Sequence, residues 1–519
     1  MSDKLFCLIK SMSKQEKRYF KIFASNNRKN SNYVKLFDFI AKLEEYKDEI
    51  VKEKFSKENF ISQLHVTKNL LHKLILRSLT VYHAEISEES KIKELLRFVE
   101  ILYHKGLYDQ CVYFLEKAEK IAQDNLYYIG VIEILEWKSK IAFITTKTSD
   151  LKKYLISDYK DEIEKLKILK NKSIYRQLFY EILILNNEGT PIRSDSELEK
   201  YEKIMNNSYI KNEKIADSFF SRMMLYHINA YYYLNKGNIV KSHNYCKQVV
   251  ELLEANPTQI IKSPIHYIAA LNNYIYTCTQ IGLFEQCYPA LNKLKNVISF
   301  YNLPNDLTIN LKETIFVRSN YLELELYKES CEFEKAKTLI NELKNQQDLL
   351  LSLPTTRYKI FLLYTISYTY FILEEYSNAL WWINNVLNIT EQREPIDIFC
   401  FARVLNLLIH YELNNYDQIE YINNSNLRFF TTRNRMFKFE LLFFSFLKNV
   451  ISKDELLEND LKKLKTDLRT TIKDNQELKA LQYFDYFSWI DCKIKKIGMS
   501  ESLKNKRKSK LYNKNVNPC

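Results

Sequence analysis

The stretch that decides the fold is KGLYDQCVYFLEKA, residues 105–118. Gly106 is a strong break between helical segments. Small or apolar residues follow it five, nine and twelve positions later, at Cys111, Leu115 and Ala118. That spacing puts the three on one helical face and turns the charged residues between them to solvent. The stretch therefore predicts the turn and the second helix of a helical hairpin.

The same frame returns five times later in the chain. Each copy has a turn residue, a large apolar residue two positions on, and a buried-type residue five positions on. The copies are Gly237 with Ile239, Ser242, Cys246 and Val249; Gly282 with Phe284, Cys287, Leu291 and Leu294; Cys331 with Phe333, Ala336, Ile340 and Leu343; Glu374 with Tyr376, Ala379, Ile383 and Val386; and Asn414 with Tyr416 and Ile419. Repeats of this length are typical of solenoids. We therefore expect an α-solenoid.

The helices that precede the turns agree with this frame. The positions expected to be buried in them are Ala230 and Tyr233, Ile275 and Cys278, Leu324 and Tyr327, Ser367 and Tyr370, and Leu407 and His410. The whole pattern resembles the tetratricopeptide repeat, although its copies are spaced more widely than the standard repeat of about 34 residues. The resemblance implies stacked antiparallel helix pairs in an all-α fold.

Composition excludes several other classes of protein. The chain has 519 residues but only 6 Gly and 8 Pro, too few for the tight turns of an all-β fold. The closest glycines are Gly106 and Gly130, so no phosphate-binding loop, GxGxxG or GxSxG motif exists. The eight histidines form no HExxH or zinc-finger spacing. We therefore predict no catalytic residue, no metal, no cofactor and no enzyme activity.

We expect three parts in the chain. Residues 1–90 form an N-terminal helical domain with a capping box at Ser13–Glu16, helices at 33–47 and 57–63, a break at 64–67 and a helix at 68–83. The last two helices form either a helix-turn-helix unit or an ordinary hairpin. The inward residues of the second helix are Leu70, Leu71, Leu74, Ile75 and Leu79. In a helix-turn-helix unit its outward residues are Lys68, Asn69, His72, Lys73 and Arg77. Residues 91–492 form the solenoid. The frame is lost between residues 125 and 223, although a capping box at Ser194–Glu197 predicts a helix there.

The third part, residues 493–519, is expected to be a basic, disordered tail. The net charge of the chain is +13, and this segment has only one acidic residue, Glu501. A basic end attracts nucleic acid or an acidic partner, or is a solvated tail. The irregular spacing of the nine cysteines predicts reduced thiols. Together with an N-terminus in which Lys4 and Lys10 interrupt any apolar core, this predicts a cytoplasmic protein without a membrane association.

The tetratricopeptide resemblance also implies a binding surface, because the first helices of such repeats line the concave side. The residues that it places there are His227, Tyr231, Asn272, Tyr276, Gln280, Arg318, Tyr321, Tyr364 and Tyr368. Tyrosine rings with amides and an arginine suit an extended peptide. Alternatively these rings only pack, since the chain contains 38 tyrosines. The predicted function is a scaffold for a protein or peptide partner, and the alternative is a nucleic-acid-associated regulator that uses residues 1–90 and the basic tail.

A further resemblance spans nearly the whole chain. The stretches LFCLIKSMSKQEKRYFKIFA, LHVTKNLLHKLILRSL and FDYFSWIDCKI, with the first repeat, are similar to an uncharacterised family of helical repeat proteins found in Bacteroidota. That resemblance implies a helical repeat architecture and no established activity. The Lys-rich end after Gly498 departs from the family pattern.

Overall fold

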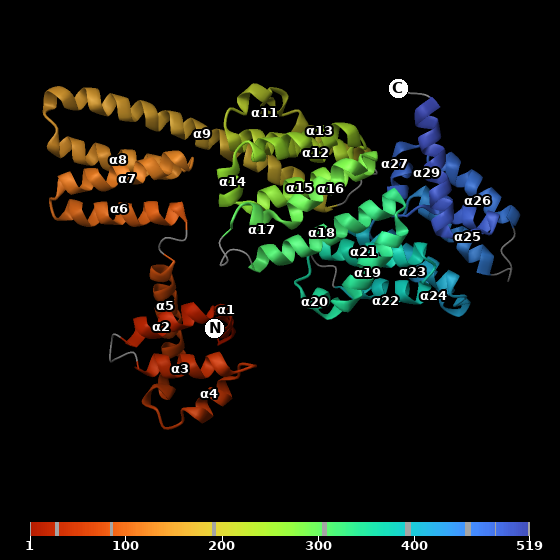
Figure 1. The fold of residues 1–519 in the computed structure, drawn as a ribbon, viewed down its shortest axis with the longest axis horizontal. Helices are drawn as coiled ribbons and strands as arrows, with labels where there is room; N and C mark the ends of the chain where they lie inside the picture. Colours follow the sequence, from red (N-terminus) through yellow and green to blue (C-terminus); the bar gives the residue numbers. More distant parts are fainter. Residues whose placement is uncertain are drawn as a thin grey trace. The chain divides into compact units, whose positions relative to one another are not determined.

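The structure is a computed structural model. It describes residues 2–25, 31–83, 87–188, 192, 194–303, 309–389, 396–451, 458–482 and 484–516. Over these residues the fold is all-α and solenoid-like, made of packed helical hairpins (Figure 1). The fold class predicted from the sequence is therefore confirmed.

Two compact units divide the chain, residues 1–169 and 170–519. The first contains α1 (Ser2–Ser11), α2 (Lys14–Ser25), α3 (Ser31–Lys42), α4 (Asp48–Lys54), the 3-10 helix η2 (Asn59–Gln63), α5 (Leu64–Tyr82), α6 (Glu88–His104), α7 (Tyr108–Asp124) and α8 (Tyr128–Thr145). The helix α9 (Thr148–Glu188) contains the division between the units. The division differs from the boundary at residue 90 that the sequence suggested.

The second unit contains the remaining helices. They are α10 (Asp195–Met205), α11 (Ser208–Lys211), η3 (Glu213–Ile215), α12 (Phe219–Asn235), α13 (Ile239–Glu254), α14 (Pro257–Lys262), α15 (Pro264–Ile281), α16 (Phe284–Lys295), α17 (Val297–Phe300), α18 (Ile309–Ser330), α19 (Phe333–Asn345), α20 (Gln347–Ser352), α21 (Arg357–Ile372), α22 (Tyr376–Leu387), α23 (Ile396–Glu412), α24 (Tyr416–Thr432), α25 (Lys438–Ile451), α26 (Glu458–Thr471), α27 (Asn475–Leu478), η5 (Lys479–Gln482), α28 (Tyr486–Lys495) and α29 (Met499–Val516).

Within the first unit, α1–α5 enclose one hydrophobic core and α6–α8 enclose another. The predicted capping box at the start of α2 is present, because the N–H of Ser13 donates to Glu16 Oε2 at 2.6 Å and the N–H of Glu16 donates to Ser13 Oγ at 3.2 Å. The predicted break at 64–67 is wrong, because α5 begins at Leu64. The orientations predicted for two residues of that helix are also wrong. Lys68 is buried and paired with Asp48, whereas Leu70 is exposed.

In the second unit, hairpins stack in the order of the chain. The first helices of the successive hairpins are α12, α15, α18, α21 and α23, and each second helix packs against the hairpin that follows, as α13 does on α15 and α22 does on α23. One continuous hydrophobic core runs from Met223 to Met499 through these layers. First helices of neighbouring hairpins also contact one another, α15 with α18, α18 with α21 and α21 with α23.

The turn of every predicted repeat has one backbone geometry. The six turn residues Gly106, Gly237, Gly282, Cys331, Glu374 and Asn414 all have positive φ, from 57° to 88°. After each of them, the next N–H donates to a carbonyl five residues earlier, at 2.8–3.0 Å. This bond closes a Schellman motif, which requires a left-handed residue at the helix end. The register of the repeat frame is therefore confirmed, and Leu126, Asn302, Asn434 and Lys496 add four turns of the same kind that the frame missed.

The small residue five positions after the turn lies where the two helices of a hairpin approach most closely. Ser242 Oγ donates to the carbonyl of Ala230 at 2.8 Å, and Cys287 Sγ donates to that of Ile275 at 3.8 Å. In the next-but-one hairpin the bond is reversed, and Ser367 Oγ donates to the carbonyl of Ala379 at 2.8 Å. A larger residue would separate the helices, so this contact explains the small side chain in every copy of the frame except the last, which has Ile419.

The prediction of a disordered tail at 493–519 is wrong for the described residues. Met499–Val516 form α29, which packs on α28, and Met499 and Ser502 are buried. Glu374 Oε1 accepts the N–H of Met499 at 3.0 Å, at the first turn of α29. A carboxylate at that end is favourable because the first N–H groups of a helix lack partners within it. The composition of residues 493–519 is typical of a solvated tail. Composition does not reveal the contact with Glu374, because that residue lies in a turn distant in the sequence.

Candidate functional site

A polar hollow of about 120 Å³ lies between the first helices of the second unit. Five successive helices, α9, α12, α15, α18 and α21, supply its walls. Its lining residues are Asn186, Tyr231, Leu234, Asn235, Asn272, Asn273, Tyr276, Tyr321, Arg357, Tyr358 and Phe361. The set combines four amides and five aromatic rings with one cation and contains no carboxylate.

Hydrogen bonds link the amides and tyrosines across neighbouring helices. Asn235 Nδ2 donates to Asn186 Oδ1 at 3.0 Å. Asn273 Nδ2 donates to the hydroxyl of Tyr231 at 3.3 Å, and Asn272 Nδ2 donates to that of Tyr358 at 3.3 Å. The last bond joins residues 86 positions apart in the sequence. The network holds the side chains of α9, α12, α15 and α21 in place around the hollow.

Two polar atoms of this region have no hydrogen-bond partner. Asn272 Oδ1 and Arg318 Nη1 are both buried and both unpartnered. Both residues contact one tyrosine, because Asn272 Nδ2 donates to the Tyr358 hydroxyl and the Arg318 guanidinium carbon is 4.2 Å from the centroid of the Tyr358 ring. A buried polar atom without a partner costs about 1–3 kcal/mol. The acceptor and the donor are therefore two polar groups beside the hollow whose hydrogen-bonding capacity is unused.

The electrostatics of the hollow favour neutral or anionic groups. Arg357 lies over the ring of Phe361 at 5.4 Å, so it adds a positive charge beside the arginine on α18. Burial raises the pKa of Tyr231 to about 12. Burial lowers the pKa of His227 to about 4, with a smaller contribution from His266. At neutral pH the tyrosine is therefore protonated and the histidine uncharged, and both act only as dipoles or packing surfaces.

The structure distributes the nine predicted binding residues over three places. Tyr231, Asn272, Tyr276 and Tyr321 line the hollow, and Arg318 stacks on its wall. Gln280 and Tyr368 line a separate, larger cavity. His227 and Tyr364 are buried, with 6% and 3% of their surface exposed, and they contact the rings of Phe179 and Tyr368 respectively. The alternative prediction, that the residues only pack, fits His227 and Tyr364.

The sequence reasoning missed Arg357, Tyr358 and Phe361 on α21. A signal was present, since Arg357 and Phe361 precede Tyr364 and Tyr368 on the same helical face with spacings of three and four residues. They precede Tyr364, which is the first residue of α21 that the repeat resemblance places on the concave side. Asn186 lies in the region where the repeat frame is lost, so no position in the sequence frame could have pointed to it.

The surfaces that the nucleic-acid alternative requires are partly occupied. On α5, Lys73 and Arg77 are exposed, whereas Lys68 Nζ is 2.8 Å from Asp48 Oδ1. On α29, Lys506 pairs with Asp485, and the Lys504 ammonium and the Arg507 guanidinium lie over the rings of Phe333 and Phe284. Three basic side chains of the predicted tail therefore contact the chain itself.

No protein-family model matches this chain, and no curated protein matches it at a significant level. Across the described ranges, no helix has the length and apolar character needed to cross a membrane. The same residues contain no group of three or more His, Cys, Asp or Glu side chains arranged to hold a metal ion. The site is therefore interpreted from its geometry alone.

Proposed function

We propose that this chain is a non-catalytic, cytoplasmic scaffold of the tetratricopeptide type, which binds an extended segment of a partner protein in the hollow. The observation that carries the proposal is the unpartnered pair of atoms, Asn272 Oδ1 and Arg318 Nη1. A peptide group offers an N–H to the first atom and a carbonyl to the second. It would remove both costs of an unpaired buried group at once.

The surrounding rings support a peptide over a free ion. Tyr276, Tyr321 and Tyr358 present flat surfaces that gain contact area at low entropic cost. A volume of about 120 Å³ suits one residue of a longer chain, not a whole folded element. The remaining contacts of such a chain would come from the rims of the neighbouring hairpins. In the described part of the chain all eight cysteines are free thiols, in keeping with a reducing compartment.

The test begins with the purified full-length protein and a displayed library of random peptides, which supplies a binding sequence for measurement. Replacing Asn272 with Leu removes the unpartnered acceptor and keeps the shape of the side chain. We expect at least a tenfold loss of affinity for the selected peptide, equal to about 1.4 kcal/mol. The melting temperature should hardly change, because the two hydrogen bonds that the Asn272 amide donates are long, at 3.3 and 3.4 Å.

Arg318→Met gives an independent second measurement, with Arg222→Met on the exposed face of α12 as its matched control. The first substitution should weaken binding at least tenfold and the control less than twofold. Tyr364 is left unchanged because it does not line the hollow. Full affinity in both stable variants would place the peptide elsewhere and refute the proposal.

A further inference from the structure

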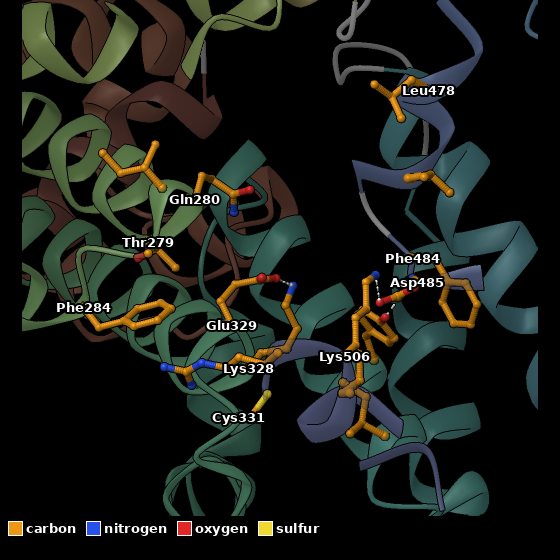
Figure 2. A pocket seen from close by; sticks show the side chains of 17 residues that line it. Thr279, Gln280, Phe284, Lys328, Glu329, Cys331, Leu478, Phe484, Asp485 and Lys506 are labelled. Carbon is orange, nitrogen blue, oxygen red and sulfur yellow. Dashed lines mark hydrogen bonds and ion pairs between the residues drawn. The ribbon is translucent and has the colours of Figure 1, made fainter. Parts of the chain in front are cut away.

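A second and larger cavity, of about 690 Å³, lies in the same unit, between the solenoid and its own C-terminal segment. One wall comes from the ends of α15, α18 and α21 and contains Gln280, Glu329, Cys331 and Tyr368. The opposite wall comes from α27, η5 and α29 and the segment before α28. Figure 2 shows Phe284 and Lys328 on one side and Phe484, Asp485 and Lys506 on the other. Cavities of this size commonly hold small ligands.

The lining is divided between apolar and charged groups. The apolar residues are Ile281, Phe284, Ile372, Leu478, Leu481, Phe484 and Leu503. The rings of Tyr368 and Phe484 are in contact, with centroids 5.2 Å apart, and the Tyr368 hydroxyl accepts the N–H of Asp485 at 3.0 Å. The C-terminal segment is therefore attached to the solenoid at this wall. The cavity it encloses suits a molecule with an apolar body and a polar end.

The charges of the cavity leave one cation without an acidic partner. Glu329 lies 3.6 Å from Lys328, which also binds Glu325 at 2.9 Å, and Asp485 pairs with Lys506 (Figure 2). Asp485 is therefore paired one to one, whereas Lys328 is shared between two glutamates. Arg507 lies over the ring of Phe284, 4.6 Å from its centroid, and no carboxylate of the described residues pairs with it. Of the five charged residues that line the cavity, three are cations and two are carboxylates, and Arg507 on α29 is the cation that no carboxylate pairs with in the described part of the chain.

Of the charges near the Cys331 thiol, Arg507 has the largest effect on its pKa. Burial raises the pKa of Cys331 most, Arg507 opposes that rise, Glu329 adds to it, and Lys504 opposes it more weakly. Cys331 and Arg507 both line the cavity, so this cation acts on its interior. A buried or half-buried cation binds an oxyanion more strongly than it binds a neutral acceptor. Charge-assisted hydrogen bonds are roughly twice as strong as those between neutral groups.

We infer that this cavity binds a small amphipathic carboxylate, with an alkyl body against the leucine and phenylalanine side chains and its carboxylate on Arg507. Arginine is suited to this role because its planar fork of donors matches a carboxylate. The α29 helix thus completes a binding site, in place of the solvated tail that its composition suggests. This inference is independent of the peptide site in the hollow.

The test uses decanoate as the probe, with decan-1-ol and decyltrimethylammonium as ligands of the same chain length. Calorimetric titration of the full-length protein should show decanoate binding at least tenfold more tightly than either. In Arg507→Gln the affinity for decanoate should fall at least tenfold. In Lys508→Gln, which removes the same charge at the exposed neighbouring residue, it should change less than twofold.

The position of the ligand is tested by alkylation with iodoacetamide, followed by mass spectrometry of individual cysteines. Decanoate should slow the modification of Cys331 at least fivefold in the parent and less than twofold in Arg507→Gln. The exposed Cys7 is the internal control, and its rate should not change. Absence of decanoate binding, equal binding of the alcohol, or unprotected Cys331 would each overturn the inference.

Discussion

The substitution Ala379→Glu tests the repeat register most directly. Ala379 is fully buried on α22, and its carbonyl accepts the hydroxyl of Ser367 on α21 at 2.8 Å. A glutamate there must fit into the closest contact of the hairpin, and overpacking of this kind costs about 1–3 kcal/mol. The carboxyl must also stay neutral, because an unpaired buried charge costs more. Holding a group with a reference pKa of about 4.3 neutral at pH 7 costs about 3.7 kcal/mol.

The total destabilisation at pH 7 is therefore about 5–7 kcal/mol, which is comparable to the whole stability of many domains. The cost of keeping the buried carboxyl neutral depends on pH. The pKa of the new carboxyl is raised in the folded state, so its penalty is small below the unfolded pKa and grows as the pH rises. At pH 5 it falls to about 1 kcal/mol. The variant should thus recover about 2.7 kcal/mol relative to the parent between pH 7 and pH 5.

The assay is denaturant unfolding followed by circular dichroism at 222 nm, for parent and variants at both pH values. Ala379→Gln has the same shape without the titrating group, so it should be destabilised by about 1–3 kcal/mol at both pH values. Ser377→Glu, at an exposed position of the same helix, should change stability by less than about 0.5 kcal/mol. If Ala379→Glu unfolds like the parent, or its penalty does not depend on pH, the assigned packing of α21 on α22 is wrong.

Three further predictions concern the backbone, a buried histidine and the C-terminal helix. Gly282→Ala should cost about 1–2 kcal/mol by denaturant unfolding, because its φ of 82° is left-handed and no atom lies near the added methyl group; an unchanged midpoint would contradict the turn assignment. His227 has its pKa lowered to about 4 from 6.5, so the unfolded state binds more protons between these values and stability is lost as the pH falls below 6.5. The loss should reach about 2 kcal/mol at pH 5 relative to His227→Phe, and a difference that stays constant with pH would refute it. Truncation after Gly498 should lower the melting temperature because Met499 is buried, whereas truncation after Lys508 should leave it nearly unchanged; equal melting of both would mean that α29 does not dock.

Much of the fold could be predicted because its signals are local. The turn residues and the small residues five positions later follow from the geometry of one hairpin, and that hairpin is repeated. Glu374 shows the limit of this reasoning. Its position in the frame predicted a turn, but only the folded chain reveals that its carboxylate accepts the first N–H of α29.

The candidate site was predicted in part, for a related reason. Tyr231, Asn272, Tyr276 and Tyr321 share a face within each first helix, and that face follows from helical periodicity. Which of the facing residues reach an open hollow depends on how far each hairpin is rotated against the next. Tyr364 has the same pattern in the sequence, yet it does not line the hollow and its ring contacts Tyr368.

The sequence by itself determined the helix pairs, the positions of their turns and the small residue that lets each pair close. These features depend on interactions within about forty residues. Tertiary structure alone decided the amide contact between Asn272 and Tyr358 and the docking of α29 across the turns of distant hairpins. Such contacts join residues from about 86 to more than 200 positions apart. They depend on the summed rotation of several hairpins, which no local pattern of side chains encodes.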